Sequence, residues 1–389
     1  MSNFAEKLKA FLHDPIDKCF DIQGHENRAK LYANLLGVSG VLGVKGPDMI
    51  ASCMERSLLP ERVIQVFNEI RHPLSEGYLT VSNINPNDAF NSIRETYEQI
   101  GKEIGNWEDK KKFFFLWRNL QDEIFEKAKS ENWVKYLPVL PADTRVPDHS
   151  IWEHLKIASS VLAFWDGKTL IQNNSLFLFS IGPVQSFIAQ ARKTQDFYMG
   201  SFILSFLTFK AMEVIIDKFG PTNIIYPDLY KQPLVDWFIK KNFKDFELLE
   251  FKEEHLQLPI GFKEEHLQLP TIPNRFVAIL PLSNKDEINS TIVEQMKKKI
   301  GDTIKEAKET IFSELKPTSD ILDENKIKKI QEKINSQLSE FPEIYWVALP
   351  WKIGNKDISF SDFKNILDNN ILEKYEKLWN FADKEGEFF

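Results

Sequence analysis

The sequence predicts an α+β protein with a helical first half and a mixed second half. Apolar residues recur every three to four positions through residues 1–165, which indicates amphipathic helices. From residue 175 onward, short apolar runs bounded by turn residues alternate with helical patterns, which is typical of a small sheet packed against helices. A chain of 389 residues is long enough for two or more domains, each with its own core.

The first half supplies the helix candidates in order. Two sets of apolar residues each fall on one helical face: Phe4, Leu8, Phe11 and Leu12, and then Val63, Val66, Phe67 and Ile70. Glu108–Lys129 is a further helix candidate. A proline-rich stretch at 136–150 interrupts the helices, and a last helix is expected from about Ser150 to Phe164. We assign this all-helical domain to residues 1–170.

Strand and helix candidates alternate in the second half. Strands are expected at Leu176–Ile181, Asn223–Tyr226, Arg275–Leu280 and Ile344–Leu349. Helices are expected at Val184–Arg192, Ser201–Phe219 and Glu287–Leu338. The last of these is rich in both charges and is predicted to be a solvated helix pair broken near Pro317. The alternation predicts a domain at 175–355 with a helical insertion near 287–338, followed by a helical tail at 356–389.

The nonapeptide FKEEHLQLP occurs twice, at 251–259 and again at 262–270. Two copies are too few for a repeat array, which needs about three units or more. We therefore expect a duplication within a surface loop or an extended hairpin. The histidines that it contains, His255 and His266, are expected to be exposed rather than to form a metal pair.

Composition and charge exclude several classes of protein. A net charge of −8 argues against a uniformly basic nucleic-acid-binding protein, although local basic patches are compatible with it. Cys19 and Cys53 are too few for a disulfide framework or a four-thiolate zinc site, as in a reducing cytoplasm. The N-terminus has no signal-peptide pattern, and the longest apolar run, around Ser201–Phe209, is shorter than a membrane span. We expect a soluble cytoplasmic protein that makes no membrane contact.

Histidine and aspartate residues gather in the first half. The adjacent pair His13 and Asp14 can offer one metal ion a ligand from each side chain. Further ligands from neighbouring helices would complete a nitrogen–oxygen site that polarises a water molecule, and the candidates are Asp48, His149 and His154. Taken singly, each histidine is equally compatible with a capping or hydrogen-bonded residue near a helix end. As a set, they favour a metal site. His25, in a loop-like GHE, and His72, in a turn, are left outside it.

The stretch SLFLFSIGPVQSFIAQARKTQDFYMGSFILS, at 175–205, is the second candidate site. An apolar strand ends at a Gly-Pro turn and a helical pattern follows, and the start of a helix presents backbone N–H groups to phosphates. The candidate nucleotide contacts are Gly182, Pro183, Gln185, Ser186 and Arg192. The alternative is a strand–helix packing unit in which the stem of Arg192 covers apolar surface.

Both candidate sites resemble parts of one protein family. GPVQSFIAQARKTQDFYMGS is similar to the first palm segment of the large, polymerase-like subunit of type III-B CRISPR effector complexes. The segments LHDPIDK, GHENRA, GPDMIAS and LPADTRVPDHSIWEHL resemble, in this order, parts of the N-terminal HD domain of that subunit. NIIYPDLY, LPTIPNRFVAILP and FPEIYWVALPW match later segments of the family more weakly.

The resemblance implies a circularly permuted HD-type domain of helices, followed by a ferredoxin-like palm domain related to nucleotide cyclases and polymerases. It assigns His13 and Asp14 as the metal-binding and catalytic dipeptide and Asp48 as the distal aspartate. His154, together with His149, would supply the histidines of the closing helix. Because some members are metal-dependent single-strand DNases, it also implies Mn²⁺, Ni²⁺ or Mg²⁺ at the HD site, single-stranded DNA as substrate and ATP at the palm. The implied partners are other subunits of the complex and, through them, crRNA and target RNA.

A Gly-Gly-Asp-Asp motif is absent, since the sequence has no Gly-Gly and no Asp-Asp. In the family, a second palm carries this motif, and its carboxylates hold the two metal ions that join ATP into cyclic oligoadenylates. We therefore expect no oligoadenylate synthesis from this chain alone, and a separately encoded second-palm polypeptide as a further partner. Two other hypotheses remain: a catalytically inert scaffold subunit of the same complex, and a stand-alone HD phosphohydrolase that acts on nucleotides.

Overall fold

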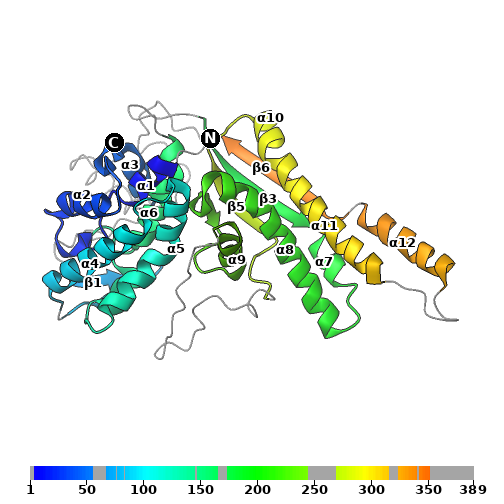
Figure 1. Cartoon of the computed structure of the whole chain (residues 1–389), viewed down its shortest axis with the longest axis horizontal. Coiled ribbons are helices and arrows are strands. Elements are labelled where there is room, and N and C mark those ends of the chain that lie inside the picture. The colour runs from blue at the N-terminus through cyan, green and yellow to red at the C-terminus, as the bar shows by residue number, and fades with distance from the viewer. Residues whose placement is uncertain are drawn as a thin grey trace, which may run out of the picture. The chain divides into compact units, whose positions relative to one another are not determined.

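The computed structural model divides into two compact units (Figure 1). The structure describes residues 4–55, 67–75, 77–82, 84–144, 147–164, 173–243, 269–314, 323–339 and 341–350. Those up to residue 164 form the first unit and those from residue 173 form the second. Nearly all of the duplicated nonapeptide, the expected break near Pro317 and the expected tail at 356–389 lie outside the described residues.

Helices dominate the first unit. The α-helices are α1 (Phe4–Phe11), α2 (His25–Leu35), α3 (Lys45–Glu55), α4 (Pro86–Ile104), α5 (Asp109–Ala128) and α6 (Ile151–Ser160). Short 3-10 turns lie between them: η1 (Lys18–Phe20), η2 (Val41–Gly43), η3 (Val134–Val139) and η4 (Val161–Phe164). The core forms where α1 and α4 pack on α5, whose Phe113, Phe114 and Leu116 are fully buried. Burying these large apolar side chains is the main stabilising contribution.

Local sequence signals explain where two of these helices begin. Asn85 caps α4, because its side-chain oxygen accepts the backbone N–H of Asn87, and Pro86 occupies the first helical turn. Ser150 caps α6 in the same way, since its hydroxyl accepts the backbone N–H of Glu153. The start of α6 is thus fixed within one residue of the predicted position.

A small hairpin corrects the prediction of an all-helical unit. The strands β1 (Glu69–Arg71) and β2 (Tyr78–Thr80) pair antiparallel, with Ile70 opposite Leu79. The helix predicted to run through Ile70 is therefore wrong at that residue. The physical reason is the turn chemistry of the following segment HPLSEG, which favours a chain reversal over a continuing helix. Val63 and Val66, from the same predicted helix face, lie outside the described residues.

The second unit contains a four-stranded antiparallel sheet. Its strands are β3 (Ser175–Gly182), β4 (Ile224–Tyr226), β5 (Arg275–Leu280) and β6 (Glu343–Pro350). They lie in the order β4-β5-β3-β6, and every neighbouring pair is antiparallel. All four strands confirm the sequence prediction within one residue at each end. Short apolar runs bounded by turn residues are a strong signal for such strands.

Helices cover one face of this sheet. The described helices of this unit are α7 (Val184–Ile188), α8 (Thr194–Phe219), α9 (Pro233–Asn242), α10 (Lys285–Ile288), the π turn η7 (Asn289–Val293), α11 (Glu294–Glu314) and α12 (Glu324–Leu338); the 3-10 turn η5 (Pro221–Asn223) precedes β4. Figure 1 shows α8 and α11 running alongside the strands. Phe177, Phe179 and Phe276 are fully buried on the covered face. The residues between them on β3 and β6 point the other way, and Leu178, Tyr345 and Val347 are exposed.

Two helices differ in extent from the prediction. The helix predicted at Val184–Arg192 ends at Ile188, and α8 begins at Thr194, earlier than expected. The Asp196 carboxylate accepts the backbone N–H groups of Arg192 and Lys193, which stabilises a new helix start at this point.

Helix α8 is longer than the apolar run around Ser201–Phe209 that it contains. Among the described residues, α8 is the one helix that is long and apolar enough to cross a membrane by length and composition, and 67% of its most apolar window is buried. Core helices of globular units pass the same test, because a helix buried on most sides is apolar on most sides.

Gly101 offers a test of the packing between α2 and α4. A Cβ at Gly101 would lie 2.0 Å from the backbone carbonyl oxygen of Leu35, so alanine cannot fit without moving α2. We expect Gly101→Ala to lower the free energy of unfolding by about 2 kcal/mol or more. The matched control is Gly301→Ala in α11, where a Cβ meets no atom within 4 Å. There alanine should stabilise the helix by up to about 1 kcal/mol. Urea denaturation followed by circular dichroism measures both effects, and a Gly101→Ala midpoint equal to that of the wild type would contradict the packing.

Candidate metal centre

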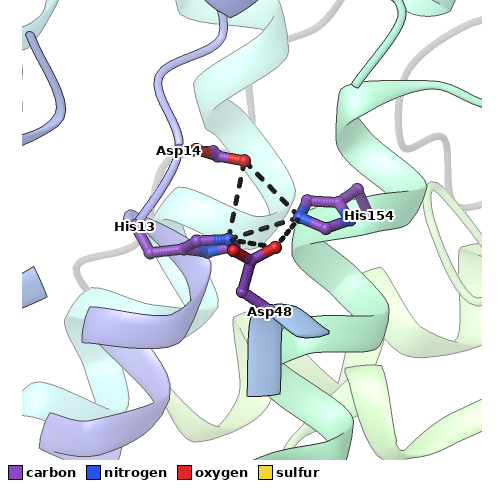
Figure 2. Close-up of side chains that lie close together, drawn as sticks. All are labelled: His13, Asp14, Asp48 and His154. Atoms are coloured by element: carbon purple, nitrogen blue, oxygen red, sulfur yellow. Dashed lines mark hydrogen bonds and ion pairs between the residues drawn. The ribbon is translucent and has the colours of Figure 1, made fainter. Parts of the chain in front are cut away.

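Four side chains from three helical segments converge in the first unit (Figure 2). His13 and Asp14 directly follow α1, Asp48 lies in the first turn of α3, and His154 lies on α6. Each offers one ligand atom, and the four atoms all lie within 4.8 Å of one another. The cluster contains four of the five residues predicted as metal ligands.

The end of α1 directs His13 into the cluster. Pro15 follows the dipeptide and cannot continue the helix, because it lacks a backbone N–H and restricts the residue before it. The Nδ1 atom of His13 lies 2.7 Å from the carbonyl oxygen of Ala10. A proton on Nδ1, donated to this carbonyl, leaves the lone pair of Nε2 facing the site.

The distances fit a donor set for a transition-metal ion. The Nε2 atoms of His13 and His154 are 3.2 Å apart. Oδ2 of Asp14 lies 3.6 Å from Nε2 of His13 and 3.5 Å from Nε2 of His154. Oδ1 of Asp48 lies 3.6 Å and 3.3 Å from the same two nitrogen atoms. Two imidazole nitrogens and two carboxylate oxygens suit Mn²⁺ or Ni²⁺ in ligand type, and their formal charges sum to the −2 that a divalent cation neutralises.

Burial differs among the four side chains. His13, Asp14 and His154 are buried, whereas the side chain of Asp48 is 39% exposed. The site is therefore closed on the side of the dipeptide and α6 and accessible beside α3. A catalytic metal site needs such an accessible side, because water and substrate must reach the remaining coordination positions.

Both carboxylates are held in the ionised form. Burial by itself would raise the pKa of Asp14, but the adjacent His13, His154 and Lys18 more than offset this and hold the pKa well below its usual range. Burial likewise opposes ionisation of Asp48, and the neighbouring His13 and His154 lower its pKa. Because a carboxylate must be deprotonated to bind a cation, both groups are ready for a metal ion at neutral pH.

A buried network fixes the turn that follows the dipeptide. Asp17 is fully buried. Its carboxylate accepts a hydrogen bond from Nε of Arg28 at 2.8 Å and another from the hydroxyl of Tyr32 at 2.5 Å. Arg28 also donates to the carbonyl oxygen of Asp21 at 2.6 Å. These bonds tie η1 to α2, and they limit the movement of the backbone that carries Asp14.

Lys18 is a site residue that the sequence prediction missed. Its Nζ lies 2.5 Å from Oδ2 of Asp14, the same oxygen that faces the two histidines. The available signal was the spacing of four residues between Asp14 and Lys18, which brings opposite charges together in a tight turn.

His149 is not brought into the cluster. Its backbone carbonyl accepts the N–H of Ala142, and its Nδ1 lies 2.8 Å from Oδ1 of Asp148. It lines a small cavity beside the β1–β2 hairpin, together with His72 and Tyr78. His25, which we left outside the site, lies nearer: its Nε2 is 3.8 Å from Oδ1 of Asp14.

The predicted nucleotide contacts follow β3. Gly182 is the buried last residue of β3 and pairs with Glu343, and its peptide bond to Pro183 is cis. Gln185 and Ser186, on α7, and Arg192, beyond it, are exposed. The helix α7 has only five residues, so its N-terminus carries less dipole than the longer predicted helix would.

Comparison with known proteins identifies relatives of both units. Residues 176–313 match the family model described as CRISPR-associated protein Cmr2, N-terminal. The CRISPR system Cmr subunit Cmr2 of Pyrococcus furiosus is 28% identical over 450 aligned residues, which cover 99% of this chain and 46% of the relative. Cmr2 of Saccharolobus solfataricus is 25% identical over 328 residues, which cover 71% of this chain and 29% of the relative. The chain thus spans less than half the length of the curated relatives that it matches.

Solved structures share the fold. A chain of type III-B Cmr-beta in the apo state, solved by cryo-EM, matches with a TM-score of 0.67 and 20% identity, covering 99% of this chain and 40% of that chain. Cmr-beta bound to cognate target RNA matches with a TM-score of 0.54 and 19% identity, with the same coverage.

Metal titration tests the composition of the cluster. By isothermal titration calorimetry with MnCl₂ or NiCl₂, we expect one site in the wild type and at least about tenfold weaker binding in His154→Ala and Asp48→Asn. His154→Ala removes one ligand atom of the cluster, and Asp48→Asn removes the negative charge of another ligand. The matched control is His149→Ala, which removes an imidazole from outside the cluster and should bind like the wild type. Equal affinity in His154→Ala and the wild type would contradict the assignment.

Proposed function

We propose that the first unit is a metal-dependent single-strand DNase of a type III-B CRISPR effector complex. The chain is a relative of the Cmr2 subunit of type III-B CRISPR systems and corresponds to its N-terminal part. The observation that carries this proposal is the convergence of His13, Asp14, Asp48 and His154 on one point. In this proposal, residues 1–170 form an HD-like domain, and His13 and Asp14 are its catalytic dipeptide.

The chemistry of the proposed site follows from the donor set. When bound, Mn²⁺, Ni²⁺ or Mg²⁺ would polarise a water molecule for attack on a phosphodiester. His13 and His154 would hold the ion through Nε2, with Asp14 and Asp48 as the balancing charges. Asp48 lies on the accessible side, so the DNA strand would approach past α3. The buried network around Asp17 would keep the dipeptide in place while the substrate binds and leaves.

For the second unit we propose a palm domain at 175–355 that contributes half of an ATP pocket. The sheet order β4-β5-β3-β6 supports it, because this is the split βαβ arrangement of ferredoxin-like sandwiches. Helix α8 lies between β3 and β4 in the chain and α11 between β5 and β6, and α9 is an additional helix between β4 and β5. Gly182, Pro183, Gln185, Ser186 and Arg192 would be the residues of this half. The other half would come from a separately encoded second-palm polypeptide.

The proposed partners are the other subunits of the effector complex, with crRNA and target RNA reached through them. The likeness to Cmr-beta, one structure of which is bound to cognate target RNA, supports this proposal.

A cleavage assay tests the proposed DNase. We expect the wild type with MnCl₂ to cut a labelled single-stranded oligonucleotide, and EDTA or the double variant His13→Ala/Asp14→Ala to abolish cutting, because both treatments remove the metal. His149→Ala is the matched control and should cut at the rate of the wild type. Equal cutting by the wild type and the double variant would contradict the proposal, and absence of cutting in both would favour an inert scaffold. Release of phosphate from a nucleotide panel instead would favour the stand-alone phosphohydrolase.

A further inference from the structure

The ammonium group of Lys18 contacts a carboxylate oxygen that a bound metal ion would need. Nζ of Lys18 lies 2.5 Å from Oδ2 of Asp14, and that oxygen also lies 3.5 Å from Nε2 of His154. An ion ligated by the four clustered atoms would therefore share Oδ2 with a second positive charge. Like charges on one oxygen repel strongly when the site is shielded from water, and the Asp14 side chain is only 4% exposed.

The charge balance of the site also indicates that the Lys18 ammonium and a divalent metal ion disfavour each other. Without a metal ion, the carboxylates of Asp14 and Asp48 face two imidazoles, and the formal charge of Lys18 compensates one of them. With a divalent ion, the two carboxylates are already neutralised, and the ammonium becomes a surplus charge. A buried carboxylate needs one cation, either the ammonium or the metal, because leaving it unpaired is costly.

The side chain of Lys18 can leave while its backbone stays. The turn η1 is tied to α2 through Asp17, Arg28 and Tyr32, and the N–H of Lys18 donates to the carbonyl oxygen of Pro15. The Lys18 side chain, in contrast, is 20% exposed. Rotation of its flexible stem takes the ammonium into water without disturbing the turn.

We propose that Lys18 is a built-in counter-ion of Asp14 that competes with the divalent metal ion for Oδ2, and so lowers the affinity of the site for that ion. This inference rests on the proposed metal-binding function. It assigns Lys18 a role in controlling metal occupancy, distinct from that of the four ligands.

Calorimetric titration of the full chain with MnCl₂ tests the competition without any activity assay. We expect Lys18→Met to bind Mn²⁺ about tenfold more tightly than the wild type, because the ion no longer displaces an ammonium; tenfold corresponds to about 1.4 kcal/mol. Lys18→Arg, which keeps the charge, should bind like the wild type. Lys129→Met is the matched control, since it removes the charge of an exposed lysine that pairs with Glu126, and it should also bind like the wild type.

The outcomes separate this inference from the proposed function. If the wild type binds Mn²⁺ and Lys18→Met binds it equally or more weakly, the competition is overturned and the metal site stands. If neither binds Mn²⁺, both fail. If Lys18→Met binds Mn²⁺ and the wild type does not, the competition is supported, and the Lys18 ammonium excludes the ion from the wild-type site. Thermal melting shows whether Lys18→Met folds. Without metal, Lys18→Met should have a lower melting temperature than the wild type. Mn²⁺ should raise the melting temperature of Lys18→Met by more than it raises that of the wild type.

Discussion

Two buried or half-buried carboxylates facing two imidazole nitrogens form the interaction on which the candidate site depends. Asp14 and Asp48 can lie this close only because positive or polarised groups surround them. The helical packing of the first unit supplies those groups by bringing the end of α1 beside α6 and the start of α3 beside both. Without the two imidazoles beside them, the two carboxylates would repel each other at this distance. The packing of these helical segments therefore holds one pair of anions close together.

The sequence predicts the second unit better than the first. The strands β3, β5 and β6 are apolar runs that end at Gly, Pro or Asn residues, and such signals locate strands well. Strand pairing is less accessible to sequence, because the order β4-β5-β3-β6 depends on contacts between distant segments. The hairpin β1–β2 was missed because its strands have three residues each and show no alternation of burial. The early start of α8 was missed because it depends on one side chain, Asp196, that caps the helix.

For the candidate site, sequence was informative about residue types and uninformative about geometry. The adjacency of His13 and Asp14 and the gathering of other histidines pointed to the cluster that the structure contains. The exclusion of His149 could not be predicted, because it depends on a backbone bond to Ala142 and a contact with Asp148. Lys18 was missed because its only signal is a spacing of four residues from Asp14, which many surface pairs share. The Asp17–Arg28–Tyr32 network was missed because a buried ion pair carries no motif of its own.

That same network has a consequence for how the first unit would acquire the proposed metal ion. In zinc fingers, metal binding and folding are one event, because the ligands have no other reason to converge. Here, α1, α4 and α5 have an apolar core of their own, and Asp17 fixes the turn behind the dipeptide. In the proposed function, the unit would therefore fold before it binds the metal ion, and a chelator would remove the ion without unfolding the unit. Metal occupancy would then depend on the concentration of the ion in the surroundings.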